Sequence, residues 1–164
     1  MDELNSNYSP RFPSKLAISK VINPLPKPTV CRYCSGPVKI ANHCEIYGRA
    51  YSSWPWAYFC TVCSASVGMH PLTDIPLGTL ADANLRRIRR KCKTPFEKIW
   101  REGVLTRSEA YSALAQHLGI SLEMCHFGYF DAENCLKAES WSKILINTSS
   151  LISTTSQNLR PNLR

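Results

Sequence analysis

The chain contains no run of apolar residues near the length of about 18 that a transmembrane helix needs. Residues 1–20 carry acidic groups and lack an apolar segment, which argues against a secretory signal. Acidic residues are also scarce, since 12 Asp and Glu stand against 20 Lys and Arg, and the net charge is +8. This excess favours a polyanionic or acidic partner, and the lack of a long apolar run argues against a membrane protein.

The folded part of the chain is expected between two polar ends. Residues 1–29 hold five prolines among Ser, Asn and Lys, and we expect a flexible leader because proline fixes φ and removes an N–H donor. Residues 147–164 are rich in Ser, Thr and Asn and predict a disordered tail. Segment 30–69 contains short β-rich pieces, the second of them at 47–51, separated by Gly and Pro, which is a hairpin pattern.

Segment 70–146 carries helix signals. Capping residues predict three to four helices that start near Asp82 or Thr79, and near Thr94, Thr106 and Asp131. Pro95 supports the second of these starts because proline is favoured at the first helical position. Glu109, three residues after Thr106, completes a capping box, and Gly119 predicts the end of that helix.

Eight cysteines without a secretory signal point to metal binding rather than disulfides. Two Cys-x-x-Cys pairs stand out, Cys31 with Cys34 and Cys60 with Cys63, with 25 residues between the pairs. Each pair can form a tight turn that aims two thiolates at one ion, and four thiolates make a closed tetrahedral site for structural Zn²⁺. Gly36 suits such a turn because the backbone approaches the sulfur atoms closely. Two disulfides or unrelated core cysteines remain the alternative interpretation.

The other cysteines are more ambiguous. Cys92 continues the helical periodicity of Ala81, Leu85 and Ile88, which predicts a core position. A second metal site is an open alternative, with ligands drawn from His70, Cys125, His126 and Cys135. Adjacent residues on a helix point about 100° apart, which weakens this alternative.

Residues 85–101 concentrate the positive charge of the chain, with eight basic residues and one acidic residue, Glu97. We predict that one face of this helix binds nucleic acid or an acidic host protein. The predicted binding residues are Arg86, Arg87, Arg89, Arg90 and Lys93. The plain alternative is a solvated helix face.

Five aromatic residues of the hairpin segment could stack on single-stranded bases next to this helix. They are Tyr47, Tyr51, Trp54, Trp56 and Tyr58. The alternative is that they cover the core of the hairpin.

Two other functions, a helix-turn-helix DNA-binding protein and a metal-dependent nuclease, are alternatives to this one. Residues 114–121 resemble the centre of a helix-turn-helix, but the reading helix would be 121–126, which has no Arg or Lys. A metal-dependent nuclease would need a second, open metal site at His70, His126 and Asp131. The chain has no paired acids in a fixed register, so the sequence favours a protein that is not an enzyme.

The order of motifs is distinctive. It includes the two Cys-x-x-Cys pairs, His70-Pro71, Thr73-Asp74, the 76–81 stretch PLGTLA, Phe96-x3-Trp100 and Cys125-His126. Over about 31–137 it resembles a zinc-finger-containing family found mostly in bacteriophages and prophages. The resemblance implies a protein of the bacterial host cytoplasm with Zn²⁺ at the four paired cysteines, and it implies no established activity. The family pattern has Cys at the position of Met69 and His shortly before Phe96, so a second metal site there would be incomplete.

The sequence therefore predicts an α+β protein in which a small zinc-ribbon-like hairpin at 30–69 packs on three to four helices at 70–146. The expected function is that of a phage accessory protein that binds nucleic acid or a host protein through its basic helix. Zinc would stabilise a β segment that is too small to fold alone.

Overall fold

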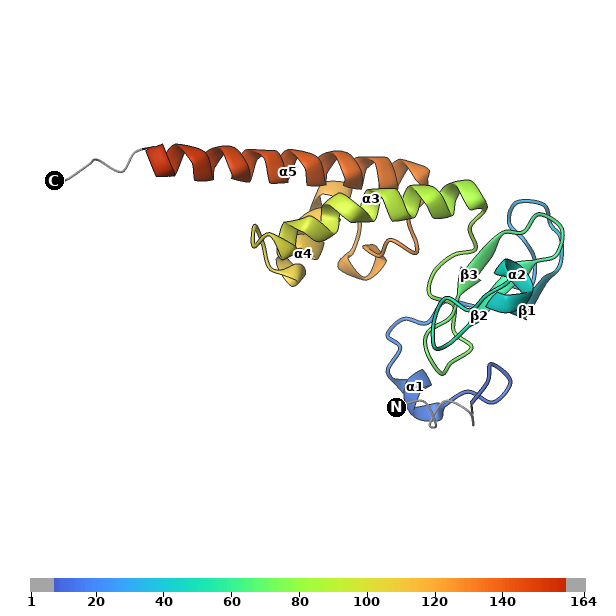
Figure 1. Cartoon of the computed structure of the whole chain (residues 1–164). Helices are drawn as coiled ribbons and strands as arrows, with labels where there is room; N and C mark the ends of the chain where they lie inside the picture. Colours follow the sequence, from blue (N-terminus) through green and yellow to red (C-terminus); the bar gives the residue numbers. More distant parts are fainter. Residues whose placement is uncertain (1–7, 159–164) are drawn as a thin grey trace. The chain divides into compact units, whose positions relative to one another are not determined.

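The computed structural model describes the backbone of residues 8–158 and the side chains of residues 8–151 (Figure 1). The chain forms two compact units, the first ending at Arg86 and the second beginning at Arg87. The first unit holds all the strands and the second holds most of the helical residues. This confirms the α+β class.

The first unit is built on a three-stranded antiparallel sheet in the order β1-β2-β3. Its strands are β1 (Val38–Asn42), β2 (Trp56–Cys60) and β3 (Ser66–Gly68). Val38 lies opposite Cys60 and Ala57 lies opposite Gly68. Two short helices, α1 (Lys15–Ser19) and α2 (His43–Tyr47), complete the unit.

Aromatic side chains form much of the core of the first unit. Trp54 and Tyr58 are buried together with Met69 and Leu80. The Trp54 indole N–H donates to the carbonyl of Thr73 at 3.0 Å, and the Tyr58 hydroxyl donates to the carbonyl of Asp74 at 2.7 Å. Both rings are therefore buried with their polar atoms satisfied, which is the usual requirement for core Trp and Tyr.

The second unit is helical. Its elements are the greater part of α3 (Ala83–Arg101), α4 (Arg107–Leu118), the 3₁₀ turn η2 (Leu122–Met124) and α5 (Ala132–Asn158). Phe96 lies at the centre of its core, and its ring centroid lies within 5.0 Å of the ring centroids of Trp100, Tyr111 and Phe127. No helix in the described part of the chain is both long and apolar enough to cross a bilayer.

The predicted helix caps agree with the structure at three of four starts. Asp82 accepts from the N–H of Leu85 at 2.7 Å, and Asp131 accepts from that of Asn134 at 2.8 Å. Thr106 forms the predicted capping box with Glu109.

The predicted start at Thr94 was wrong, because α3 continues through Pro95 without a break. Cys92, Phe96 and Ile99 lie at helical spacing and are all fully buried, so packing of this face outweighs the hydrogen bond that proline removes. The Thr94 hydroxyl donates instead to the carbonyl of Arg90 at 3.2 Å.

Two other segments of the first unit, residues 47–51 and 15–19, also differ from expectation. Residues 47–51 were expected to be β-rich, but α2 ends at Tyr47, and Gly48 closes it in the left-handed region with a φ of 76°. Residues 15–19 of the predicted leader form α1, and Ser14 donates its N–H to the carbonyl of Leu72 at 2.9 Å.

Helix α5 extends into the segment predicted to be a disordered tail and ends at Asn158. Thr148, Ser149 and Ser150 each donate their hydroxyl to the backbone carbonyl four residues earlier, at 2.9–3.0 Å. The three hydroxyl groups therefore have hydrogen-bond partners within the helix, and these residues lie in α5 although their composition is typical of a tail. Residues 1–7 of the predicted leader and 159–164 of the predicted tail lie outside the described residues.

Candidate metal centre

The first Cys-x-x-Cys pair sits in a tight backbone turn. The Cys31 N–H donates to the carbonyl of Gly36 at 2.8 Å, and the Ser35 N–H donates back to the carbonyl of Cys31 at 2.9 Å. Ser35 adopts a left-handed conformation with a φ of 57°, which folds the chain around the two cysteines.

The second pair forms the same turn, with the corresponding backbone hydrogen bonds. The Cys60 N–H donates to the carbonyl of Ala65 at 2.8 Å, and the Ser64 N–H donates to the carbonyl of Cys60 at 3.1 Å. Ser64 is also left-handed, with a φ of 62°. The unit therefore presents two equivalent knuckles, one before β1 and one after β2.

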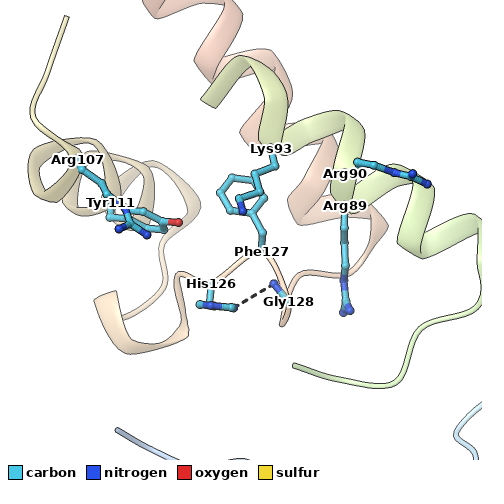
Figure 2. A pocket seen from close by; sticks show the side chains of 8 residues that line it. All are labelled: Arg89, Arg90, Lys93, Arg107, Tyr111, His126, Phe127 and Gly128. Carbon is cyan, nitrogen blue, oxygen red and sulfur yellow. Dashed lines mark hydrogen bonds between the residues drawn. The ribbon is translucent and has the colours of Figure 1, made fainter. Parts of the chain in front are cut away.

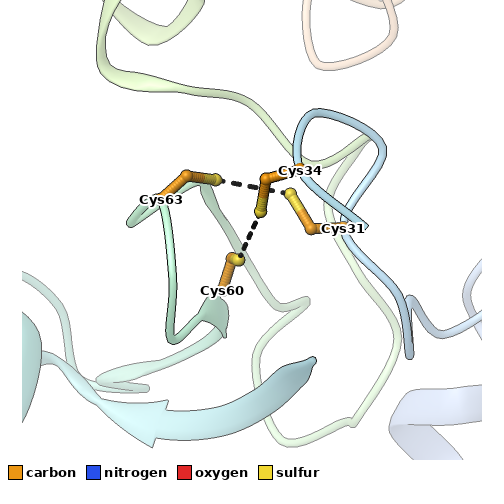
Figure 3. Close-up of side chains that lie close together, drawn as sticks. All are labelled: Cys31, Cys34, Cys60 and Cys63. Carbon is orange, nitrogen blue, oxygen red and sulfur yellow. Dashed lines mark hydrogen bonds between the residues drawn. The ribbon is translucent and has the colours of Figure 1, made fainter. Parts of the chain in front are cut away.

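The two knuckles face each other and bring four sulfur atoms together (Figure 3). Cys31 Sγ lies 3.5 Å from Cys63 Sγ, Cys34 Sγ lies 3.5 Å from Cys60 Sγ, and all four atoms lie within 4.8 Å of one another. A tetrahedral zinc ion with Zn–S bonds of about 2.3 Å requires sulfur–sulfur separations of roughly 3.8 Å. The four cysteines are thus positioned to bind a metal ion, and the arrangement is consistent with Zn²⁺.

Backbone N–H groups point at these sulfur atoms. The Tyr33 N–H donates to Cys31 Sγ at 3.4 Å. The N–H of Cys63, with a further contribution from that of Val62, lowers the pKa of Cys60 to about 6. At Cys63 the N–H of Ala65 lowers the pKa, but burial and the three neighbouring thiols outweigh it and raise the value to about 12. Because the crowded thiols cannot all ionise without a cation between them, the site favours a divalent metal ion.

Gly36 is required by the contact between the two knuckles. A Cβ at this position would lie 2.7 Å from Val62 Cγ2 in the other knuckle and 3.2 Å from Cys34 Sγ. The equivalent position in the second knuckle is Ala65, a buried residue with a Cβ of its own. The turn itself therefore tolerates a Cβ, and the space beside Val62 does not.

The four-cysteine cluster is the only group of three or more His, Cys, Asp or Glu side chains, within the described part of the chain, that is close enough to hold a metal ion. Cys125 and Cys135 are buried in the core of the second unit. His126 Nδ1 accepts from the N–H of Gly128 at 3.1 Å, and Asp131 caps α5. Neither the second metal site nor the open site of a nuclease is therefore assembled in this region.

Other residues that the sequence predicts to bind a partner have contacts within the fold instead. Arg86 donates to the carbonyls of Ser64 and Ala81 and to the hydroxyl of Ser66, at 2.8–3.3 Å, so it holds the first unit together. Trp54 and Tyr58 are core residues, whereas Tyr47 and Tyr51 are exposed. In place of a reading helix after Gly119 there is the three-residue turn η2, which is too short to serve as a helix-turn-helix reader.

The predicted binding residues of α3 differ in their surroundings. Arg89 donates through Nε to the carbonyl of Phe130 at 2.8 Å, and Lys93 lies 3.3 Å from the carboxylate of Glu97. Arg87 and Arg90 are exposed.

A cavity of about 330 Å³ opens beside α3 in the second unit (Figure 2). Its lining consists of Arg89, Arg90, Lys93, Arg107, Tyr111, His126, Phe127 and Gly128. Arg107 and Tyr111 are not among the binding residues predicted from the sequence. The signal was available at Arg107, because a basic residue in the first turn of a helix opposes the helix dipole.

The fold and the cysteine cluster define a small zinc-ribbon-like metal-binding protein. The model of a protein family described as zinc-finger-containing domain matches residues 27–144, and the chain belongs to this family. No curated protein and no solved structure matches the chain.

Proposed function

We propose that this protein is a zinc-stabilised accessory protein that binds nucleic acid through the basic face of α3. The observation that carries the proposal is the charge of residues 85–101, where eight basic residues stand against Glu97 alone. Clustered arginines suit a phosphate backbone because each guanidinium offers a planar fork of donors.

The contacts within the second unit indicate which of these residues are best placed to meet a partner. Glu97 pairs with Lys93 and Arg101, and Glu139 lies 3.6 Å from Lys91. Arg87, Arg90 and Lys98 are exposed side chains spread along the helix. We therefore assign the main phosphate contacts to these three residues, which we call the α3 basic face.

A binding role is favoured over a catalytic one because the four-thiolate site leaves no open position for a water molecule or a substrate. The resemblance to proteins of bacteriophages and prophages extends the proposal to an accessory role in a bacterial cytoplasm. An acidic host protein is the competing partner.

The test is charge reversal of the α3 basic face, by Arg87→Glu, Arg90→Glu and Lys98→Glu together. The matched control reverses three exposed basic residues of the first unit, Arg11, Lys15 and Lys20. Fluorescence anisotropy with labelled single-stranded and duplex DNA and RNA, over a range of salt concentrations, measures the affinity.

We expect the α3 triple variant to lose affinity by about tenfold or more, and the control variant to retain most of it. The wild-type affinity should fall steeply with salt, with a log–log slope of about −0.9 per phosphate contacted on duplex DNA. Equal binding by wild type and the α3 variant would refute the assigned surface. Absence of any salt-dependent nucleic-acid binding by the wild type would refute the proposed function and favour an acidic protein partner.

A further inference from the structure

The cavity beside α3 has an unusual lining. Its charged side chains are all basic and come from two helices, with Arg90 and Lys93 on α3 and Arg107 on α4. No Asp or Glu lines it. Among the described residues, neither Arg90 nor Arg107 forms an ion pair with an acidic side chain. Of these three basic groups only Lys93 lies beside an acidic side chain of the described residues, that of Glu97 at 3.3 Å. Basic groups held around one space create a local positive potential that favours an anion.

The basic groups are held in place by their surroundings. Arg89 is fixed by its hydrogen bond to the carbonyl of Phe130, at 2.8 Å. The Arg107 guanidinium lies over the ring of Tyr111, 5.7 Å from its centroid. Arg107 is also the first residue of α4, directly after the cap Thr106, where its charge opposes the helix dipole. A residue that breaks a local stability rule in this way is a candidate for a functional position.

One wall of the cavity is aromatic. Tyr111 packs edge-on against Phe96 at 4.9 Å between centroids and lies parallel to Trp100 at 6.3 Å, so its ring is supported from behind. Phe127 lines the cavity next to it. Supported aromatic rings beside basic side chains are the combination that binds bases and phosphates of single-stranded nucleic acid.

His126 adds a hydrogen-bond donor to the lining. Its Nδ1 accepts from the Gly128 N–H at 3.1 Å (Figure 2). In the neutral ring this places the proton on Nε2, so the other edge of the imidazole is a donor. The volume of about 330 Å³ lies at the lower end of small-molecule pockets, which span roughly 300–1,000 Å³, and suits one nucleotide and not a larger ligand.

We propose that this cavity binds a single nucleoside phosphate, with the phosphate held by Arg90, Lys93 and Arg107 and the base against Tyr111. The inference rests on the proposed function and deepens it, because the ligand is either the terminal nucleotide of a strand or a free nucleotide. The shared chemistry is a phosphomonoester attached to a nucleoside. A planar base explains the aromatic wall, which a bare anion would not require.

The experiment uses the full zinc-loaded chain and isothermal titration calorimetry. The probes are adenosine monophosphate, inorganic phosphate, and a short oligothymidine with either a 5′-phosphate or a 5′-hydroxyl group. Arg107→Ala removes a cavity cation and Tyr111→Leu removes the aromatic wall. Lys20→Ala is the matched control, since it removes one exposed cation that lies outside the cavity and outside the α3 basic face.

We expect Arg107→Ala to weaken binding of the nucleotide and of the 5′-phosphorylated strand by about tenfold or more, and Lys20→Ala to change it by about twofold at most. Tyr111→Leu should weaken binding of the nucleotide by more than binding of inorganic phosphate, because it removes the wall for the base, whereas at the phosphate it removes only the support of the Arg107 guanidinium. Preference for the phosphorylated strand over adenosine monophosphate identifies a strand end as the ligand, and the reverse identifies a free nucleotide.

Two results would overturn the proposal. One is the absence of nucleotide binding by the wild type at millimolar concentration. The other is equal weakening by Arg107→Ala and Lys20→Ala. If Arg107→Ala binds long strands normally while the triple variant of the α3 basic face does not, the pocket assignment fails and the proposed function stands. Circular dichroism of Arg107→Ala confirms that α4 is intact, as expected when a residue that opposes the helix dipole is removed.

Discussion

A single methyl group at Gly36 should weaken the metal centre. In Gly36→Ala the new Cβ would lie 2.7 Å from Val62 Cγ2, 3.0 Å from Val62 Cβ and 3.2 Å from Cys34 Sγ. Val62 is exposed, but its Cβ is fixed by the backbone, so rotation about χ1 moves Cγ2 and cannot relieve the contact with Cβ. Relief must come from a shift of one knuckle against the other, which costs about 1–3 kcal/mol by analogy with overpacked cores.

If this cost falls on the metal-bound state, zinc affinity drops roughly 5- to 150-fold. Competition with a chromophoric chelator measures the affinity, and thermal unfolding with and without chelator measures its effect on stability. The matched control is Gly36→Ala in a Val62→Ala background, where the nearest contact is removed and most of the affinity should return. Unchanged zinc affinity in the single variant, or an equal loss in both backgrounds, would refute the steric explanation.

Three further predictions follow from the two units. Elemental analysis should find one zinc ion per chain, lost in Cys60→Ser and retained in Cys44→Ser, whose cysteine lies outside the cluster. Burial raises the pKa of Tyr58 to about 12 from 10.0, so the folded state favours the neutral phenol. This contribution to stability is present below pH 10 and is lost as the pH rises toward 12. Denaturant unfolding at alkaline pH should therefore show a smaller loss of unfolding free energy in Tyr58→Phe than in wild type. Thr106→Ala should destabilise the second unit by about 1 kcal/mol in chemical denaturation, whereas Thr94→Ala, at an exposed site inside α3, should have little effect.

The metal centre could be predicted from the sequence because its information is local. Each Cys-x-x-Cys pair specifies its own knuckle, and Gly36 marks the close approach. The same holds for the cap at Thr106, whose partner Glu109 stands three residues away. Within each knuckle, and at this cap, the residues that interact are near neighbours in the chain, so their spacing places them. The meeting of the two knuckles was predictable because one tetrahedral ion needs the thiolates of both pairs.

The errors arose where distant packing decides the outcome. Thr94 and Pro95 have the local signature of a helix start, but the buried face of Cys92, Phe96 and Ile99 keeps α3 continuous. The cavity was missed because Arg107 and Arg90 are remote in sequence and meet only through the packing of α4 beside α3. Charge counting along one helix could find neither the pocket nor the structural role of Arg86.

The pairing of β1 with β2 ties the metal centre to strand alignment. Cys60 ends β2 opposite Val38, and the Thr61 N–H donates to the carbonyl of Pro37 at 3.2 Å. Because side chains alternate between the faces of a strand, a slip of one residue would turn Cys60 to the wrong face, away from Cys34. A metal ion that requires all four thiolates can bind only the correctly aligned hairpin. We therefore expect metal binding to select the correct strand alignment during folding, and a chain without metal to lose this selection against slipped hairpins.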